Sequence, residues 1–287
     1  MIQEVTVLSG KGGTGKTSLV ASFAALAENK VMVDCDVDAA DLHLILKPEV
    51  KETNDFYGLN EYLINKDICI ECGKCEELCR FDAIDNFQID GLYCEGCGIC
   101  FLACPVSAIE TKERVCGQWF ISKTEYGPLV HAKLGIAQEN SGKLVAEVRK
   151  AAKKMAQKKG IPLVITDGSP GIGCPVIASL SGTNLVLIVT EPTVSGAHDL
   201  ERILDLCAHF KIKSLVCINK FDLNLKKTRE IKELCKERSV EVVGKINYDS
   251  IFTEALIKGV PVVEFSDGET SRRIKSLWGN LYNKLSS

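Results

Sequence analysis

A glycine-rich segment near the start of the chain has the composition of a phosphate-binding loop. Residues 9–18 read Ser-Gly-Lys-Gly-Gly-Thr-Gly-Lys-Thr-Ser and fit the pattern G-x-x-x-x-G-K-T/S. A polyphosphate needs many N–H donors at close range, and glycines let the backbone approach it. Lys16 is expected to neutralise the β- and γ-phosphates, and Thr17 to ligate Mg²⁺. The residues predicted to bind nucleotide here are Gly10, Gly12, Gly13, Thr14, Gly15, Lys16, Thr17 and Ser18.

A predicted strand downstream of this loop ends in carboxylates. Residues 30–36 are apolar up to the acidic end at Asp36, and Asp38 and Asp41 follow. In open parallel sheets, ligands bind at the carboxyl ends of the strands. These side chains are therefore candidates for the metal and water of the nucleotide site, Asp36 more so than Asp38 and Asp41.

A second predicted strand, residues 162–167, also ends in a carboxylate, Asp167. Asp167 is expected to bind Mg²⁺ through water. The glycine-rich turn that follows allows the change of φ that a nucleotide-sensing switch requires. We expect the N–H of Gly171 in this turn to sense the γ-phosphate.

Eight of the fourteen cysteines form two runs of identical spacing. Each run reads C-x2-C-x2-C-x3-C, and the two are offset by 25 residues. The first contains Cys69, Cys72, Cys75 and Cys79, and the second contains Cys94, Cys97, Cys100 and Cys104. Disulfides do not explain this spacing, which points to metal binding. Zinc is one alternative, because C-x2-C pairs also hold Zn²⁺.

The loop with its second lysine, Lys11, resembles the deviant phosphate-binding loop of the MinD/ParA and nitrogenase iron-protein superfamily. The resemblance implies a nucleotide-sandwich homodimer in which Lys11 reaches the partner's nucleotide. It also implies that Asp36 contacts a Mg²⁺-bound water or orients the attacking water. Lys11, Lys16, Asp36 and Asp167 are thus the predicted catalytic residues, and Thr17, Asp36 and Asp167 the predicted Mg²⁺ site.

Residues 219–222 resemble the N-K-x-D guanine reader of GTPases, with Asn219 and Asp222 as the expected base contacts. Deviant-loop ATPases often carry an asparagine here to read adenine. The whole pattern favours ATP over GTP, and GTP is the alternative.

The cysteine runs resemble the bacterial two-cluster ferredoxin, which holds two 4Fe-4S clusters. In that arrangement the fourth cysteine of each run ligates the other cluster. The resemblance therefore assigns one cluster to Cys69, Cys72, Cys75 and Cys104, and the second to Cys94, Cys97, Cys100 and Cys79. Cys116 and Cys174 lie outside the runs and are predicted to be structural, with a further metal role as the alternative.

The predicted fold class is α/β, with a doubly wound, mostly parallel sheet and an inserted small α+β ferredoxin-like domain. The expected boundaries are 1–60 and 112–287 for the ATPase domain and 61–111 for the insert. Residues 48–60 are turn-prone and predicted to be a connection that leaves the sheet. An apolar stripe predicts a C-terminal helix from residue 271 to about 285, which docks on its own domain or, alternatively, on a membrane surface.

Composition limits the remaining possibilities. The net charge of −3 and the pI near 5.9 argue against general nucleic-acid binding. Without a signal peptide or a long apolar run, the chain is expected to be cytoplasmic, with little membrane contact.

The predicted function is an iron–sulfur ATPase in which ATP, Mg²⁺ and dimer closure gate electron transfer to a redox partner protein. The alternatives are an ATP-dependent iron–sulfur cluster carrier and a positioning ATPase whose clusters sense redox state.

Overall fold

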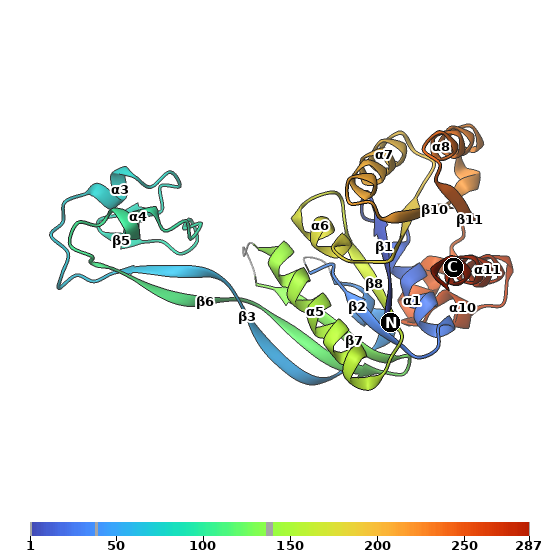
Figure 1. Ribbon diagram of the computed structural model, residues 1–287, viewed down its shortest axis with the longest axis horizontal. Helices are drawn as coiled ribbons and strands as arrows, with labels where there is room; N and C mark the ends of the chain where they lie inside the picture. The colour runs from blue at the N-terminus through green and yellow to red at the C-terminus, as the bar shows by residue number, and fades with distance from the viewer. Residues whose placement is uncertain (1, 38–39, 136–139, 287) are drawn as a thin grey trace. The chain divides into compact units, whose positions relative to one another are not determined.

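The computed structural model describes residues 2–37, 40–135 and 140–286 (Figure 1). Asp38, one of the candidate carboxylates, lies outside this range. The chain forms two compact units. Unit 1 comprises Met1–Thr53, Trp119–Lys133 and Ser141–Ser287, and unit 2 comprises Asn54–Gln118 and Leu134–Asn140.

Unit 1 is built on a sheet whose central strands are parallel. The strand order is β11-β10-β9-β1-β8-β2-β7-β6-β3, and all the pairs from β11 to β7 run parallel. The strands are β1 (Gln3–Ser9), β2 (Lys30–Asp34), β3 (Glu49–Ile64), β6 (Ile109–Thr124), β7 (Gly127–Leu134), β8 (Leu163–Pro170), β9 (Leu185–Thr190), β10 (Lys213–Asn219) and β11 (Glu241–Ile246). The predicted α/β class with a mostly parallel sheet is confirmed.

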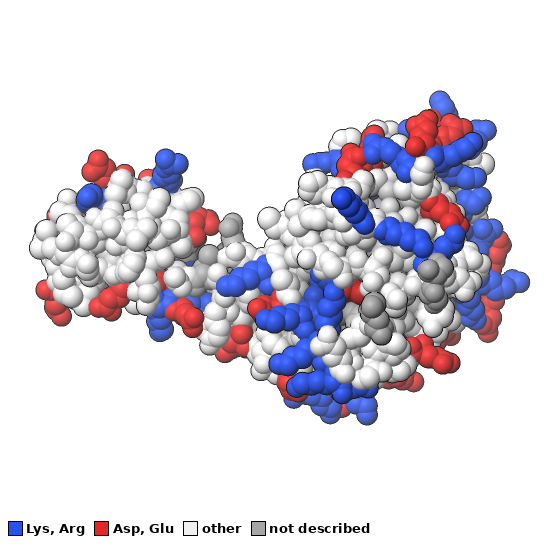
Figure 2. Space-filling model, viewed as in Figure 1, with Lys and Arg blue, Asp and Glu red and all other residues white. Residues whose placement is uncertain are grey.

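Helices cover both faces of this sheet (Figure 1). They are α1 (Lys16–Leu26), α2 (Leu42–Leu46), α5 (Ser141–Lys159), α6 (Cys174–Leu180), α7 (Val194–His209), η1 (Phe221–Leu223), α8 (Leu225–Glu237), α9 (Ile251–Lys258), α10 (Val262–Phe265) and α11 (Glu269–Ser286). Basic side chains gather over α5, where Lys150, Lys154 and Lys158 are exposed (Figure 2).

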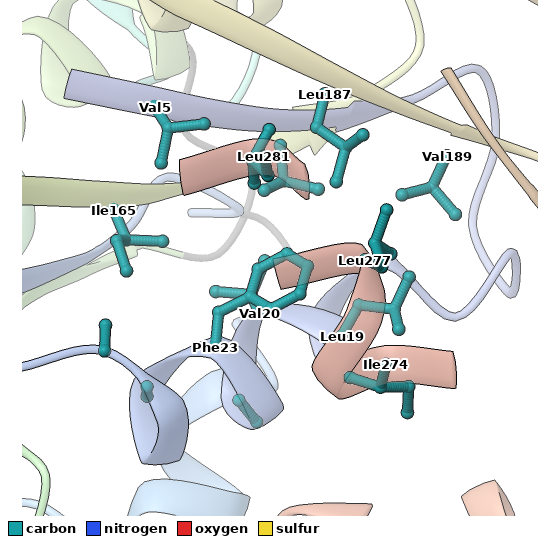
Figure 3. Close-up of a cluster of buried hydrophobic side chains, with 14 of the residues drawn as sticks. Val5, Leu19, Val20, Phe23, Ile165, Leu187, Val189, Ile274, Leu277 and Leu281 are labelled. Carbon is teal, nitrogen blue, oxygen red and sulfur yellow. The ribbon is translucent and has the colours of Figure 1, made fainter. Parts of the chain in front are cut away.

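The central strands are apolar throughout because both of their faces are buried. Side chains alternate between the faces, so Leu187 and Val189 of β9 join the cluster with α1 and α11, while Val186 and Ile188 join the cluster with α6, α7 and α8. Figure 3 shows Leu187 and Val189 near Leu19 of α1. Because both faces of the central strands are packed, the ends of these strands, which carry the predicted site, are held in place.

The C-terminal helix α11 packs into this core. Ile274, Leu277 and Leu281 are fully buried and point toward α1 and the sheet (Figure 3). Trp278 stacks against Phe23, with ring centroids 5.2 Å apart. The apolar stripe is therefore occupied by the protein's own core, and the membrane-docking alternative for this stripe is wrong. Among the described residues, no helix is long and apolar enough to cross a membrane.

The expectation of a turn-prone connection at residues 48–60 is wrong, because all but the first of these residues belong to strand β3. Gly58 suggests a turn because glycine is common in turns. Here glycine is needed for another reason, since neighbouring side chains leave no room for a Cβ. A Cβ at Gly58 would lie 2.9 Å from Cε1 of Phe56 and 3.3 Å from the Cβ of Cys116 in β6. Hydrogen bonding to β6, which is distant in sequence, overrides the local signal. Both β3 and β6 run through the two units.

Unit 2 contains both cysteine runs and little regular structure. Its short elements are α3 (Lys74–Glu77), β4 (Ile84–Asp85), β5 (Gln88–Ile89) and α4 (Ile99–Ala103). Strands β4 and β5 pair antiparallel between the two runs, and α3 packs against α4.

Candidate functional site

The glycine-rich residues form the turn between β1 and α1. Gly15 has φ 89°, a left-handed conformation, and directly precedes Lys16, the first residue of α1. A Cβ at Gly15 would lie 2.5 Å from Nδ2 of Asn219. That same Nδ2 donates a 2.7 Å hydrogen bond to the carbonyl of Thr14. The end of β10 therefore fixes the shape of the loop.

Lys16 is buried against the predicted magnesium ligand. Its Nζ lies 2.6 Å from Oδ1 of Asp167, and both side chains are almost fully enclosed. Burial alone would lower the pKa of Lys16, but the carboxylates of Asp167, Asp34 and Asp36 raise it overall. The lysine is thus held in its charged form, as an anion-binding role requires.

Asp34 is a site residue that the sequence reasoning missed. The register between β2 and β8 places Asp34 opposite Asp167. Both are buried, and Oδ2 of each lacks a hydrogen-bond partner. Burial, together with the charge of Asp167, raises the pKa of Asp34 to about 8. The available signal was a carboxylate two residues before Asp36 on the same predicted strand.

These two unpartnered oxygens fit a divalent cation. Mg²⁺ is usually held by one or two protein carboxylates, with water and phosphate oxygens completing its shell. Thr17 and Asp36 line the adjoining cavity. Within the described residues, no three His, Cys, Asp or Glu side chains converge closely enough to hold an ion unaided.

A cavity of about 580 Å³ lies over the loop, within the usual size range of a small-molecule site. It is also lined by Asn247, Tyr248 and Phe252. The predicted residues that line it are Lys11, Gly12, Gly13, Thr14, Gly15, Lys16, Thr17, Ser18, Asp36, Asp41 and Asn219. Asn247, whose Oδ1 lacks a hydrogen-bond partner, was not predicted and carries no motif. The cavity is thus lined by lysines, by the residues of the loop and by two aromatic side chains.

Four predicted residues do not line this cavity: Gly10, Asp167, Gly171 and Asp222. Asp167 lies behind Lys16. Oδ1 of Asp222 accepts a 2.7 Å hydrogen bond from the backbone N–H of Tyr248, and the N–H of Gly171 donates to the carbonyl of Ser9 at 2.9 Å. Asp222 is therefore engaged in fixing the cavity wall.

The side chain of Lys11 contacts residues of its own chain. Its Nζ lies 2.7 Å from Oε1 of Glu191 and donates to Oγ of Ser195 at 3.1 Å. Glu191 follows β9 directly and also pairs with Lys220. Burial would raise the pKa of Glu191, but hydrogen bonds from the two lysines lower it overall.

In unit 2 a second cavity is surrounded by cysteines from both runs. Cys69, Cys72, Cys75 and Cys104 all line it. Apolar side chains complete its wall: Ile64, Ile70, Phe87, Val106 and Ile109. The structure therefore brings together the four cysteines that sequence reasoning assigned to one cluster, including the one from the distant run.

The 25-residue repeat extends to the hydrogen bonds of the two runs. The N–H of Ala83 donates to Sγ of Cys79 at 3.4 Å, and the N–H of Ala108 donates to Sγ of Cys104 at 3.2 Å. The segments before each run also match, because the N–H of Cys69 donates to Asn65 and that of Cys94 to Asp90, both at 3.0 Å. The sulfur atoms of the two fourth cysteines, Cys79 and Cys104, thus accept equivalent backbone hydrogen bonds.

All fourteen cysteines, each among the described residues, are free. In the second predicted set, Cys97 is exposed and Cys79, Cys94 and Cys100 are half-buried. Cys116 is fully buried in β6, which agrees with a structural role. The expectation that Cys174 is a buried apolar residue is wrong, because Cys174 is exposed at the first residue of α6.

Comparison with known proteins places the chain in a family. The model of the "CobQ/CobB/MinD/ParA nucleotide binding domain" family matches residues 5–262. An uncharacterized protein of Methanocaldococcus jannaschii is 37% identical over 227 residues, which cover 78% of this chain and 80% of that protein.

Two further likenesses are to a solved structure and to a shorter protein. The structure of the septum site-determining protein MinD from Pyrococcus horikoshii, complexed with Mg-ADP, superposes with a TM-score of 0.62. The match covers 100% of this chain and 98% of that one at 16% identity, so it supports the fold. Pyruvate synthase subunit PorD of Methanothermobacter marburgensis is 48% identical over 50 residues, which are 17% of this chain and 62% of that protein.

Proposed function

Because the chain belongs to the CobQ/CobB/MinD/ParA nucleotide-binding domain family, we propose that it is an iron–sulfur ATPase. In this proposal, binding and hydrolysis of Mg-ATP by unit 1 close and reopen a homodimer. That cycle gates one-electron transfer through two 4Fe-4S clusters in unit 2, from a donor protein to an acceptor protein.

The nucleotide half of the proposal rests on the cavity over the loop. Lys16 and the loop N–H groups face the position of the phosphates, and Thr17 and Asp36 flank it. The unpartnered oxygens of Asp34 and Asp167 would hold Mg²⁺, directly or through water. The ion would neutralise phosphate charge as ATP reacts with water to give ADP and phosphate. Lys16 must exchange its bond to Asp167 for the phosphates as the nucleotide binds.

ATP is favoured over GTP by the position of Asp222. A guanine reader must accept hydrogen bonds from the base, but Asp222 does not line the cavity and already accepts one from Tyr248. The match to N-K-x-D is then explained by two structural roles, since Asn219 holds Thr14 and Lys220 holds Gly13.

The single observation that carries the iron–sulfur half is the cavity lined by Cys69, Cys72, Cys75 and Cys104. Thiolates around a four-iron cube each bond a different iron atom, so they lie farther apart than the ligands of one zinc ion. The fourth ligand of the second cluster would be Cys79, with Cys94, Cys97 and Cys100. The similarity to PorD adds weight to this half.

The proposed coupling of ATP hydrolysis to electron transfer depends on how the protein surroundings set the reduction potential of each cluster. When bound, the clusters would supply one-electron transfer at potentials set by solvent exposure, nearby charge and hydrogen bonds to sulfur. Residues 54–118 hold twelve acidic and five basic residues, so unit 2 is strongly acidic. A closure that changes the exposure or charge around unit 2 would change the driving force for electron transfer.

Cluster content tests the proposal first. Protein purified anaerobically is analysed for iron, acid-labile sulfide and zinc, and for ATP hydrolysis. We expect about eight iron and eight sulfide per chain, as two four-iron clusters require, together with Mg²⁺-dependent hydrolysis. Zinc in place of iron, or hydrolysis that is absent with clusters intact, would contradict the proposal.

A second candidate is a positioning ATPase whose clusters sense redox state, favoured by the likeness to MinD along the whole chain. In that case ATP would alter partner or membrane binding and leave the cluster potentials unchanged. A third candidate is an iron–sulfur cluster carrier. In that case the holo protein would activate an apo acceptor protein while losing its own iron.

A further inference from the structure

Glu191 lies between two lysines that belong to different parts of the nucleotide site. Its Oε1 is 2.7 Å from Nζ of Lys11, and its Oε2 is 3.0 Å from Nζ of Lys220. The side chain of Glu191 is only 12% exposed, while that of Lys11 is 37% exposed. One carboxylate thus uses both oxygens, one on each lysine.

The same segment holds Lys11 through a second contact. Oγ of Ser195, in the first turn of α7, accepts a 3.1 Å hydrogen bond from Nζ of Lys11. Helix α7 also lies directly against the loop, since a Cβ at Gly10 would come within 2.1 Å of the Cβ of Asp199. Lys11 is therefore fixed within its own chain by elements that follow β9.

Lys220 makes release of Lys11 feasible. Its Nζ also donates to the carbonyl of Gly13 at 2.9 Å, so it is anchored to the loop independently of Lys11. If Lys11 departs, Glu191 keeps one cation beside it. A largely buried carboxylate is costly to leave without any partner, and this arrangement avoids that cost.

We propose that Glu191 and Ser195 form a resting cradle for Lys11, which withholds this lysine from a second chain until ATP-driven closure displaces it. The cradle rests on the proposed trans role of Lys11. It sets the protein concentration at which ATP-bound chains dimerise, because each Lys11 must leave Glu191 before it can reach the phosphates of the other chain.

The test is dimerisation of the holo protein, measured by analytical ultracentrifugation with a non-hydrolysable ATP analogue at saturating concentration. Glu191→Gln keeps the shape of the side chain and removes its charge. Two cradles open per dimer, so the half-dimerisation concentration is expected to fall roughly tenfold, or about threefold for each partly exposed pair.

Two controls isolate the cradle from general charge effects. Asp205→Asn removes one negative charge from α7 at an exposed position paired with Arg238, and it should leave the half-dimerisation concentration unchanged. In a Lys11→Ala background, Glu191→Gln should add nothing to the effect of Lys11→Ala. Circular dichroism melts of each variant check that the fold is retained.

A second readout uses the nucleotide-free protein at low concentration. The amine of Lys11 should react with a succinimidyl ester several-fold faster in Glu191→Gln than in wild type, while that of Lys150 on α5 reacts at the same rate in both. Mass spectrometry of peptides gives both rates.

The outcomes separate the cradle from the proposed function. An unchanged or raised half-dimerisation concentration in Glu191→Gln, with dimerisation still weakened by Lys11→Ala, overturns the cradle and leaves the trans lysine standing. If Lys11→Ala has no effect on dimerisation, the trans role fails and the cradle fails with it. Equal Lys11 reactivity in the two proteins also overturns the cradle.

Discussion

The predicted metal site depends on one oxygen atom of Asp34 and one of Asp167. Each buried carboxylate has one oxygen without a partner, and Lys16 lies against Asp167. Burial, and then repulsion from the neighbouring Asp167 carboxylate, raises the pKa of Asp34 to about 8. Lys16 neutralises only part of this negative charge, and the two unpartnered oxygens would gain from a divalent cation.

Replacing Asp34 by asparagine should separate metal binding from stability. We expect the Mg²⁺ concentration for half-maximal ATP hydrolysis to rise by about tenfold or more. The melting temperature of the nucleotide-free protein should not fall, because the amide removes the repulsion with Asp167. A lower melting temperature with unchanged Mg²⁺ dependence would mean that Asp34 is only structural. Asp205→Asn on α7 serves as the matched surface control.

Cys104 tests the exchange of ligands between the two cysteine runs. Cys104→Ser should lose the cluster held by Cys69, Cys72 and Cys75, because Cys104 lines their cavity. About half of the iron and sulfide should remain, with the electron paramagnetic resonance signal of one reduced cluster. Cys174→Ser, an exposed cysteine outside unit 2, should keep the full iron content. Equal losses in the two variants would refute this assignment.

At the scale of elements, a buried ion pair joins the strand that carries the loop to two helices. Arg149 of α5 contacts Glu4 of β1 through Nε at 2.9 Å and Nη2 at 2.7 Å. Its Nη1 also donates to the carbonyls of Ala178 and Ser181, at the end of α6. Both side chains are almost fully buried, so α5, α6 and β1 are held in one arrangement beneath the predicted switch.

Breaking this pair should destabilise unit 1 strongly. Arg149→Met leaves Glu4 buried with only Lys153 as a cation, and we expect a loss of about 3–5 kcal/mol in the free energy of unfolding. Urea denaturation followed by circular dichroism measures it. Lys153→Met, which removes the half-exposed partner, should cost less than about 1 kcal/mol. Similar losses in the two variants would argue against the central role of Arg149.

His131 on β7 gives unit 1 a defined response to acid. Burial, with a smaller contribution from His43, lowers the pKa of His131 to about 4. The unfolded chain binds a proton near pH 6.5, while the folded protein does not until near pH 4. Stability should therefore fall as the pH drops through this window.

Between pH 8 and pH 5, His131 should lower the free energy of unfolding by about 2 kcal/mol. His131→Gln should remove this part of the pH dependence. Denaturant unfolding of both proteins at pH 8 and pH 5 checks it. If the two proteins lose the same stability between these values, then His131 does not hold the predicted pKa.

At the scale of the whole molecule, contiguous motifs could be predicted from the sequence and pairings across the fold could not. Residues 9–18 and the two cysteine runs have characteristic local spacing, so the loop and the grouping of four cysteines around one cavity could be predicted. Strand β3 was missed because its pairing with β6 is non-local and Gly58 imitates a turn. Asp34 meets Asp167 only through the register between β2 and β8. Glu191 meets Lys11 and Lys220 only because the end of β9 lies beside them in the fold.

Acidic side chains are also concentrated in one part of the molecule. Residues 54–118 are strongly acidic, while basic side chains gather over α5 in unit 1 (Figure 2). Negative surroundings favour the more oxidised state of a cluster and so lower its potential. The proposed ATPase cycle would therefore act on clusters whose potentials respond to charge.

The most direct test is to measure the reduction potentials of the clusters in the holo protein under anaerobic conditions. Titrations with no nucleotide, with Mg-ADP and with a non-hydrolysable Mg-ATP analogue are compared. The account predicts a shift on the order of 60 mV between the ADP and ATP-analogue states, which is a tenfold change for a one-electron couple. Lys11→Ala, which should not close, is expected to lose this shift. Identical potentials in all three states would contradict the coupling of nucleotide to electron transfer.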